Sequence, residues 1–389
     1  MISRVFAVVV SIERTVAMHI VHLYKDYAPV LGGIEGHMQT LAQGLVRVGF
    51  TITVVVCQPR GSMHASDEIM HGVRVIRLPR HIDVASNAWS FALVRTVAKL
   101  NPDILHLQMP WPAGDLVALL LPHIPLIVSY QSDVIRQRGL LRLYAPLLRW
   151  TLAHASAICV SSKQYADTSP WLQDVLERVQ VIPLGIDDPL VELPENPNGD
   201  VPLIAAPFVL WVGRMRYYKG LHTAIRAMVE VPAPVRLVLV GTGPAEASLR
   251  TLAAECGVAD RIVWLGDCSQ ATVALLRKNA VCFVFPSNLR SEAYGLALLE
   301  AIAAGLPAIS CDIGTATSVI NVHEYTGFVI APNDAHACAV AINRLIAEPE
   351  LRAFYSQHAR AHYLAQYTTP RMIERVAAVY RSVGCAPSH

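Results

Sequence analysis

The most informative stretch of this chain is PSNLRSEAYGLALLEAIAAGLPAISCD, residues 286–312. The apolar run just before it, residues 281–285, predicts a buried strand that ends at the proline. Residues 294–304 are mostly helix formers, and a glycine and a proline then predict the end of that helix. Apolar residues 308–311 begin the next strand. This order of elements indicates a parallel α/β sheet, in which ligands bind at the carboxyl ends of the strands.

Two carboxylates stand eight residues apart in this stretch, at Glu292 and Glu300. If both were helical they would lie roughly 80° apart around the axis, so they would not share a face. We therefore expect Glu292 in the loop, facing a ligand, and Glu300 about two turns into the helix. Between them, Tyr294, Gly295 and Leu296 should offer free backbone N–H groups, which suit a phosphate. Glutamate is common in helices, so this pair alone does not specify a function.

The composition limits the possible classes of protein. With 389 residues, the chain is long enough for two domains, each with its own core. It is 53% hydrophobic, but none of its apolar runs reaches the roughly 20 residues needed to span a bilayer. A net charge of +2 argues against a nucleic-acid-binding protein. The eight cysteines lack zinc-binding spacing and the aspartates form no D-x-D motif, so we expect reduced core thiols, a cytoplasmic protein and no metal site.

Residues 1–17 are expected to be an upstream extension. The apolar run at residues 5–12 is too short for a signal peptide or a membrane anchor. The first strand is predicted at residues 18–24, which makes Met18 the expected functional start. A protein that begins at Met18 should then keep its folding and activity.

Two glycine-containing loops follow predicted strands. In the first half, Gly32 and Gly33 precede an amphipathic segment, so the backbone could approach a phosphate closely, although a plain turn fits the local sequence as well. In the second half, the predicted strand at residues 208–212 leads into a turn that contains Arg214 and Lys219. These two cations would project into one cleft and neutralise a diphosphate. A solvated basic turn is the alternative.

Taken together, these motifs resemble those of the retaining glycosyltransferases of family 4. The matching parts are GG-x-E at residues 32–35, GR-x4-KG at residues 213–220 and E-x7-E at residues 292–300. The resemblance extends from Met18 to about Tyr380. It implies the α/β GT-B fold, in which two Rossmann-like domains face each other across a cleft and the last helix crosses back to the first domain.

The resemblance also implies roles for individual residues. Glu292 would contact the donor sugar and Glu300 the ribose of the nucleotide, whereas Arg214 and Lys219 would bind the diphosphate. The turns at Gly241, Gly243 and Asp267 would flank the nucleobase. The implied donor-binding set is Gly32, Gly33, Arg214, Lys219, Gly241, Gly243, Asp267, Glu292, Tyr294, Gly295, Leu296 and Glu300. The catalytic candidates are Glu292, Arg214, Lys219 and Gln131.

The loop at residues 131–137, QSDVIRQ, resembles the HSD-x-x-RQ segment of bacterial mannosyl- and rhamnosyltransferases that build surface polysaccharides. In those enzymes the histidine lies beside the transferred sugar, but here the position is Gln131. Similarly, His106 and Gln108 stand where relatives often have His-x-His. Both departures argue against a mechanism that needs an imidazole at these points, and a positioning role is expected for Gln131.

An apolar segment with several arginines follows at residues 139–154. One interpretation is a core helix whose arginines reach the surface. The other is a face that lies on an anionic membrane, where a lipid-linked acceptor would be found. The candidate residues for the acceptor or the membrane are Asp133, Arg136, Arg138, Arg142 and Arg149.

The expected domain layout follows from these assignments. Residues 1–187 would form the acceptor-binding domain and residues 207–370 the nucleotide-sugar-binding domain, with a linker at residues 188–206 that is rich in proline and asparagine. Residues 371–389 would form the crossing helix and a tail.

The expected activity is transfer of a mannose- or rhamnose-type hexose from a GDP-linked sugar, without a cofactor and without a metal. The expected acceptor is a polyprenyl-diphosphate-linked oligosaccharide or a polysaccharide at the cytoplasmic face of the plasma membrane. Two alternatives remain open at this point. A sugar-nucleotide epimerase with the GT-B fold would bind the same donors and need no acceptor, and a non-catalytic protein would only bind the sugar nucleotide.

Overall fold

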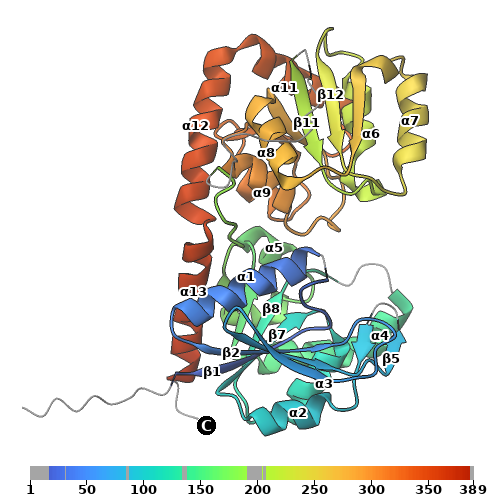
Figure 1. Ribbon diagram of the computed structural model, residues 1–389. Coiled ribbons are helices and arrows are strands. Elements are labelled where there is room, and N and C mark those ends of the chain that lie inside the picture. The colour runs from blue at the N-terminus through green and yellow to red at the C-terminus, as the bar shows by residue number, and fades with distance from the viewer. Residues whose placement is uncertain are drawn as a thin grey trace, which may run out of the picture.

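The computed structural model describes residues 17–30, 32–84, 87–133, 138–190, 204 and 207–385. Two sheets, each flanked by helices, form the two lobes in Figure 1. The expected extension, apart from residue 17, and most of the expected linker lie outside the described residues.

The sheet of the first lobe has the strand order β10-β9-β8-β7-β1-β2-β4-β3. Neighbouring strands are parallel except at the edge, where β3 and β4 pair antiparallel. Its strands are β1 (His19–Leu23), β2 (Thr51–Cys57), β3 (Ser66–Met70), β4 (Val73–Leu78), β7 (Ile104–Met109), β8 (Leu126–Tyr130), β9 (Ala157–Val160) and β10 (Val179–Val181). A separate hairpin pairs β5 (Ile82–Val84) with β6 (Asn87–Trp89). The helices are α1 (Gly33–Arg47), α2 (Leu93–Leu100), α3 (Pro112–Leu120), α4 (Arg138–His154), α5 (Lys163–Thr168) and the 3-10 helix η1 (Gln173–Arg178).

The sheet of the second lobe is entirely parallel among the described residues, in the order β13-β12-β11-β14-β15-β16. Its strands are β11 (Phe208–Val212), β12 (Arg236–Val240), β13 (Ile262–Gly266), β14 (Cys282–Phe285), β15 (Ala308–Cys311) and β16 (Gly327–Ile330). Its helices are η2 (Tyr217–Lys219), α6 (Leu221–Ala227), α7 (Glu246–Glu255), η3 (Ala259–Arg261), α8 (Gln270–Asn279), α9 (Leu296–Ala303), α10 (Thr317–Ile320), α11 (Ala335–Ala347) and α12 (Pro349–Gln366). Strands such as β14 are apolar runs because helices cover both faces of a parallel sheet.

Each sheet has a point where the strand order reverses. In the first sheet β1 and β7 are neighbours, and the chain proceeds outward from them in opposite directions. In the second sheet β11 and β14 are such neighbours. Ligands of open α/β sheets bind outside the carboxyl ends of the strands at these reversals. The Gly32–Gly33 loop follows β1, Arg214 follows β11 and Glu292 follows β14, so these motifs lie at the two reversals.

The last helix returns to the first lobe, as expected. Helices α12 and α13 (Thr369–Gly384) run along one side of both lobes in Figure 1. Ile373, Val376 and Tyr380 are buried in the core of the first sheet, whereas Tyr363 on α12 is buried in the core of the second. A Cβ atom placed on Gly44 of α1 would lie 1.8 Å from Ile373, so the two helices meet where α1 has no side chain.

The predicted start of one helix, and the predicted depth of Glu300 within it, differ from the structure. Helix α9 begins at Leu296 and not at Tyr294, because Gly295 adopts the left-handed conformation with φ of +94° and acts as the N-cap. Glu300 therefore lies little more than one turn into the helix, not two. The arginine-containing segment at residues 139–154 lies in α4, which is one continuous helix although Pro146 lies within it.

Candidate active site

The two strand-order reversals face each other across the boundary between the lobes. Helix α1 begins beside α9, since a Cβ atom placed on Gly33 would lie 3.5 Å from Leu296 Cδ1. The first N–H groups of both helices have no partner within the helix, because the first intrahelical bonds come from Gly36 and Leu299. Two helix N-termini that meet in this way attract an anion through free N–H groups and through the helix dipoles.

Lys219 and Glu292 form an ion pair at the centre of this region. The Lys219 ammonium donates to Glu292 Oε2, and Ser287 Oγ donates to the same oxygen at 3.2 Å. Only 14% of the Lys219 side chain and 11% of the Glu292 side chain are exposed. The ammonium also lies 5.2 Å from the centre of the Phe285 ring. The pair is therefore largely shielded from water, and a ligand that takes one partner must compensate the other.

A glycine makes this pairing possible. Gly220 follows Lys219 in the left-handed conformation with φ of +64°, and a Cβ atom there would lie 1.8 Å from the carbonyl oxygen of Pro286. The loop after β11 can thus lie directly against the loop after β14. This close approach places the ammonium beside the carboxylate of Glu292.

Arg214 lies five residues before Lys219 in the chain but is not part of the ion pair. Its side chain is exposed, and no hydrogen bond or ion pair involves it in the part of the chain that the structure describes. The turn that carries it is packed tightly against the turns after β12, because Cβ atoms on Gly241 and Gly243 would lie 2.0 Å and 2.4 Å from backbone oxygens of residues 213 and 215. The Arg214 guanidinium is therefore available to a ligand, and close backbone contacts hold the turn that carries it.

Asp267 lies near these turns after β13. The Thr242 hydroxyl donates to its carboxylate at 3.4 Å. The sequence singled out Gly241, Gly243 and Asp267, and the structure brings all of them to the same edge of the second sheet.

Glu300 has a partner that the sequence did not indicate. The Arg277 guanidinium, on α8, donates to Glu300 Oε2. Arg277 is buried, and this burial lowers its pKa. The Glu300 side chain is 34% exposed, so part of its carboxylate remains accessible to a ligand. A buried arginine thus fixes the orientation of this carboxylate.

The side chain of Tyr294 does not line the donor region. It is buried, and its hydroxyl donates to the carbonyl oxygen of Leu184 at 2.7 Å. Only the backbone of Tyr294 is therefore available beside Gly295 and Leu296.

The first lobe contributes an unusual polar track on one face of its central strands. His22 on β1 is in register with His106 on β7, and Gln108 with Ser129 on β8. Gln131 comes two residues after Ser129, immediately beyond the end of β8. Such faces are normally apolar in parallel sheets, so these polar side chains need partners within the protein.

Hydrogen bonds connect most of this track. Tyr380 on the crossing helix bonds to His106 Nδ1 and, at 2.9 Å, to His22 Nε2. His106 Nε2 bonds to Ser129 Oγ at 2.8 Å, and Gln131 Nε2 donates to Gln108 Oε1 at 3.1 Å. Burial lowers the pKa of His22 to about 3, so this imidazole is neutral at physiological pH.

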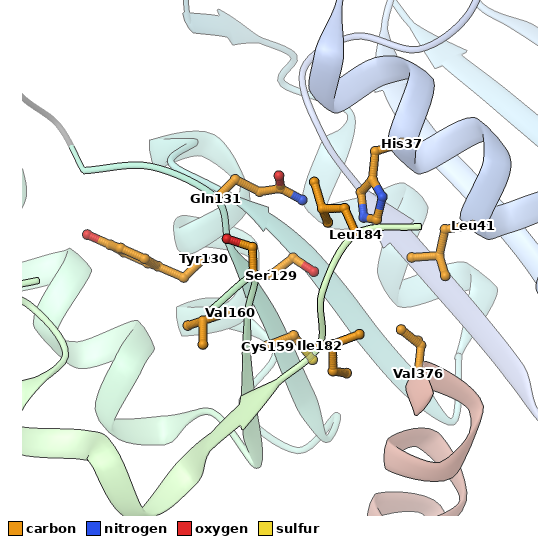
Figure 2. Close-up of a pocket in the computed structure, with 11 residues that line it drawn as sticks. His37, Leu41, Ser129, Tyr130, Gln131, Cys159, Val160, Ile182, Leu184 and Val376 are labelled. Carbon is orange, nitrogen blue, oxygen red and sulfur yellow. The ribbon is translucent and has the colours of Figure 1, made fainter. Parts of the chain in front are cut away.

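A cavity of about 20 Å³ lies at the outer end of the track (Figure 2). His37, Ser129 and Gln131 line it together with apolar side chains such as Leu41 and Leu184. His37 Nδ1 is buried without a hydrogen-bond partner among the described residues, and burial lowers the pKa of His37 to about 4. A polar cavity of this size can hold one water molecule, which would satisfy that nitrogen.

His37 was not singled out from the sequence. The available signal was its position, four residues before the buried Leu41 and hence on the inward side of the amphipathic helix α1. A polar residue on that side of a helix must find a partner in the interior.

The acceptor and membrane candidates lie in different places. Asp133 contacts the second lobe through Arg290. Arg142 and Arg149 are exposed on α4, and the Arg149 guanidinium lies 5.5 Å from the centre of the Trp171 ring. Arg136 and the side chain of Arg138 lie outside the described residues. Among the described helices, none has the length and hydrophobicity required to cross a membrane.

Comparison with known proteins identifies the family. Residues 31–189 match the model described as Glycosyltransferase Family 4, and residues 204–362 match the model described as Glycosyl transferases group 1. The chain is similar to O-antigen chain mannosyltransferase C of Escherichia coli, with 33% identity over 94% of this chain and 99% of that protein. It is also similar to the D-rhamnosyltransferase WbpZ of Pseudomonas aeruginosa, with 34% identity over 90% of this chain and 92% of that protein.

Solved structures support the fold. HepE of Anabaena in complex with UDP has a TM-score of 0.76 at 19% identity, over 94% of this chain and 100% of that chain. The sucrose-phosphate synthase of Thermosynechococcus elongatus has a TM-score of 0.74 at 21% identity, over 94% and 99%. These likenesses extend across both lobes. The chain therefore belongs to the family 4 glycosyltransferases, and its two Rossmann-like domains form the GT-B fold.

Proposed function

We propose that this glycosyltransferase moves a mannose- or rhamnose-type hexose from a GDP-linked donor, with retention of configuration, to a polyprenyl-diphosphate-linked oligosaccharide or a polysaccharide. The observation that carries the proposal is the shielded Lys219–Glu292 pair together with Arg214, whose side chain has no hydrogen-bond or ion-pair partner among the described residues, at the carboxyl ends of β11 and β14. A sugar nucleotide has two features that suit this arrangement, an anionic diphosphate and a ring of hydroxyl groups.

The diphosphate would bind to the cations. Arg214 is free to form a bidentate contact, and Lys219 can exchange its carboxylate partner for a phosphate oxygen. The N–H groups at the starts of α1 and α9 add further positive potential where these helices meet. Together these groups would stabilise the charge that develops on the departing nucleoside diphosphate. In this proposal, the protein's own cations and amides do the work of a metal ion.

Glu292 would then turn to the sugar. When the diphosphate engages Lys219, the Glu292 carboxylate loses its cation and becomes available to accept hydrogen bonds from sugar hydroxyls. Ser287 keeps one oxygen in place during this exchange. Glu300, oriented by Arg277, would accept from the ribose hydroxyls.

The named relatives support the choice of sugar. One is a mannosyltransferase and the other a D-rhamnosyltransferase, and each is about one-third identical to this chain across most of its length. We therefore propose donors of the mannose and D-rhamnose type. On the opposite side of the site, the Gln131 amide would position a hydroxyl of the transferred sugar, because an amide can donate and accept hydrogen bonds but cannot titrate near neutrality.

The proposed acceptor places the enzyme at the inner face of the plasma membrane. On α4, Leu143 is 81% exposed and stands next to the exposed Arg142. An apolar side chain beside a cation suits the interface of an anionic bilayer. This face of the first domain is where we propose that a lipid-linked acceptor approaches.

The test is an assay with the purified protein and GDP-mannose or GDP-rhamnose. We expect release of GDP only when a polyprenyl-diphosphate-linked oligosaccharide is present, and a product whose new glycosidic bond keeps the anomeric configuration of the donor. Inverted product, or failure of both donors while another sugar nucleotide is used, would contradict the proposal. Conversion of the bare donor to an epimer would instead support an isomerase.

A further inference from the structure

One arginine of the donor-side loop reaches across to the first domain. Arg290 Nη2 lies 3.1 Å from Asp133 Oδ2, and Arg290 Nη1 donates at 2.6 Å to the Thr168 hydroxyl. The same Nη1 donates at 2.6 Å to the carbonyl oxygen of Gly314 in its own domain. The guanidinium also lies 5.1 Å from the centre of the Tyr165 ring. Arg290 therefore contacts the first domain through an ion pair, a hydrogen bond and an aromatic ring.

Asp133 is held in place to receive this contact. The hydroxyls of Tyr130 and Ser169 donate to its Oδ1 at 3.0 Å and 2.8 Å, and its backbone N–H donates to the Tyr165 hydroxyl at 2.6 Å. The Asp133 side chain is 9% exposed and that of Arg290 is 29% exposed. An exposed surface ion pair contributes little because both side chains are mobile and hydrated. This pair differs because its carboxylate is already fixed and largely desolvated.

The pair lies close to both halves of the site along the chain. Asp133 is two residues after Gln131, and Arg290 is two residues before Glu292. The residues after Glu292 also contact the first domain, since Ala293 packs against its core and the Tyr294 hydroxyl binds the Leu184 carbonyl. Glu292 itself points back to Lys219. The first domain thus holds the loop on both sides of Glu292.

We propose that Arg290 and Asp133 act as a positioning pair. The pair holds the donor-side Glu292 at a fixed position relative to Gln131 across the boundary between the two domains. The inference rests on the proposed role of Glu292 as the contact to the donor sugar. Arg290 touches neither sugar nor phosphate in this scheme. It acts through the loop that carries Glu292.

A second contact between the domains explains why loss of the pair should displace the Glu292 loop without separating the two domains. Gln164 on α5 donates to Asp312 Oδ1 at 3.1 Å and accepts from the Ser318 hydroxyl at 2.7 Å. These bonds do not involve the loop of Glu292. Loss of the Arg290 contact should therefore leave the domains tied at α5 and free only the loop.

The first experiment measures kinetics and binding in Arg290→Gln and Asp133→Asn. We expect each variant to lower kcat by roughly 10- to 100-fold, because misplacement of about 1 Å costs up to that factor. Affinity for the free nucleoside diphosphate, measured by calorimetry, should stay within twofold. Arg290→Lys, which can keep the ion pair, should recover part of the loss. The matched control is Arg344→Gln, which removes an exposed arginine paired with Glu348 on α11 and should leave kcat unchanged.

The double variant tests whether the two residues act as one unit. If they form a positioning pair, Arg290→Gln combined with Asp133→Asn should lower kcat no further than either change alone. If the double variant lowers kcat by the product of the two single losses, the proposal is wrong. So would unchanged kcat in both single variants.

Hydrogen exchange separates this inference from the proposed function, because it needs no assay of transfer. Amides of residues 289–295 should exchange faster in Arg290→Gln than in Arg344→Gln, whereas those of α2 in the first domain should not change. This difference should appear even if the enzyme uses another donor. Equal protection of the loop in both variants would overturn the positioning role regardless of which sugar is transferred.

Discussion

Lys219 and Glu292 are 73 residues apart in the chain, yet the ammonium of one donates directly to the carboxylate of the other. They belong to the loops after β11 and β14, which are neighbours in the second sheet at the point where the strand order reverses. In the free enzyme, each side chain is therefore the ion-pair partner of the other, and a bound sugar nucleotide would separate them. This exchange allows the sugar and phosphate contacts to be tested independently.

The first prediction concerns the division between sugar and phosphate. Glu292→Ala should lose hydrogen bonds worth roughly 1.5 to 3 kcal/mol each, which corresponds to roughly 10- to 150-fold in the rate of transfer. It should still bind the free nucleoside diphosphate, because that ligand has no sugar. Arg214→Ala should weaken the binding of both the nucleoside diphosphate and the sugar nucleotide. Calorimetry with the nucleoside diphosphate alone checks this, and loss of binding in Glu292→Ala with full binding in Arg214→Ala would reverse the assignment.

The second prediction concerns stability. Lys219→Ala leaves the largely buried Glu292 carboxylate without its cation, so the free energy of unfolding should fall by up to roughly 3 kcal/mol. Adding Glu292→Gln should recover part of that loss, because an uncharged amide costs less to bury. Arg214→Ala is the control, since Arg214 is exposed. Urea denaturation measures the difference, and equal stability of the Lys219 and Arg214 variants would show that the pair does not stabilise the free enzyme.

The third prediction concerns Glu300. If its carboxylate contacts the ribose, the unchanged enzyme should bind a nucleoside diphosphate roughly 10-fold more tightly than the analogue without ribose hydroxyls. Glu300→Gln should bind the two ligands more nearly alike. Glu348→Gln, which removes an exposed carboxylate of the same domain, should keep the preference. A preference that survives in Glu300→Gln would assign the ribose contact to another residue.

The fourth prediction concerns pH. The folded protein binds a proton at His37 only near pH 4, whereas the unfolded chain binds it near 6.5, so stability should decrease as the pH falls through this range. The contribution of one such histidine is at most roughly 1.4 kcal/mol per pH unit. Burial raises the pKa of Asp115 to about 7, which gives a slope of the opposite sign, so the informative quantity is a difference between variants.

The measurement is urea denaturation between pH 4.5 and 6.5, values chosen to lie within that window. His37→Gln should show a weaker loss of stability toward low pH than the unchanged protein. His64→Gln removes an exposed histidine and should leave the pH dependence unaltered. A His37→Gln curve parallel to that of the unchanged protein would mean that His37 does not remain neutral in this range.

The fifth prediction concerns the membrane. If the α4 face lies on anionic lipid, the enzyme should sediment with phosphatidylglycerol vesicles at low salt and be released as salt screens the attraction. Arg142→Gln combined with Leu143→Ser should sediment less while keeping transfer to a soluble acceptor. Arg344→Gln, with one exposed cation removed elsewhere, is the control. Equal sedimentation of the two variants would show that α4 is not the surface that contacts the vesicles.

Much of the fold could be predicted from local patterns. The apolar runs predicted strands β1, β11 and β14 to within one residue at each end, and the motif after each strand fell at the sheet edge where ligands bind. The loop position of Glu292 was also correct. These features depend on residues that are neighbours in sequence, because backbone preference and hydrophobic periodicity act over a few residues.

The partners of the site residues could not be predicted in this way. Arg277 meets Glu300 from 23 residues away, and Arg290 meets Asp133 from 157 residues away. His37 on α1 lines the same cavity as Gln131. The start of α9 also shifted, since the left-handed Gly295 was not apparent from helix propensity. A side chain's partner depends on which strands become neighbours in the sheet and on how closely two loops approach, and both are settled only when the whole chain packs.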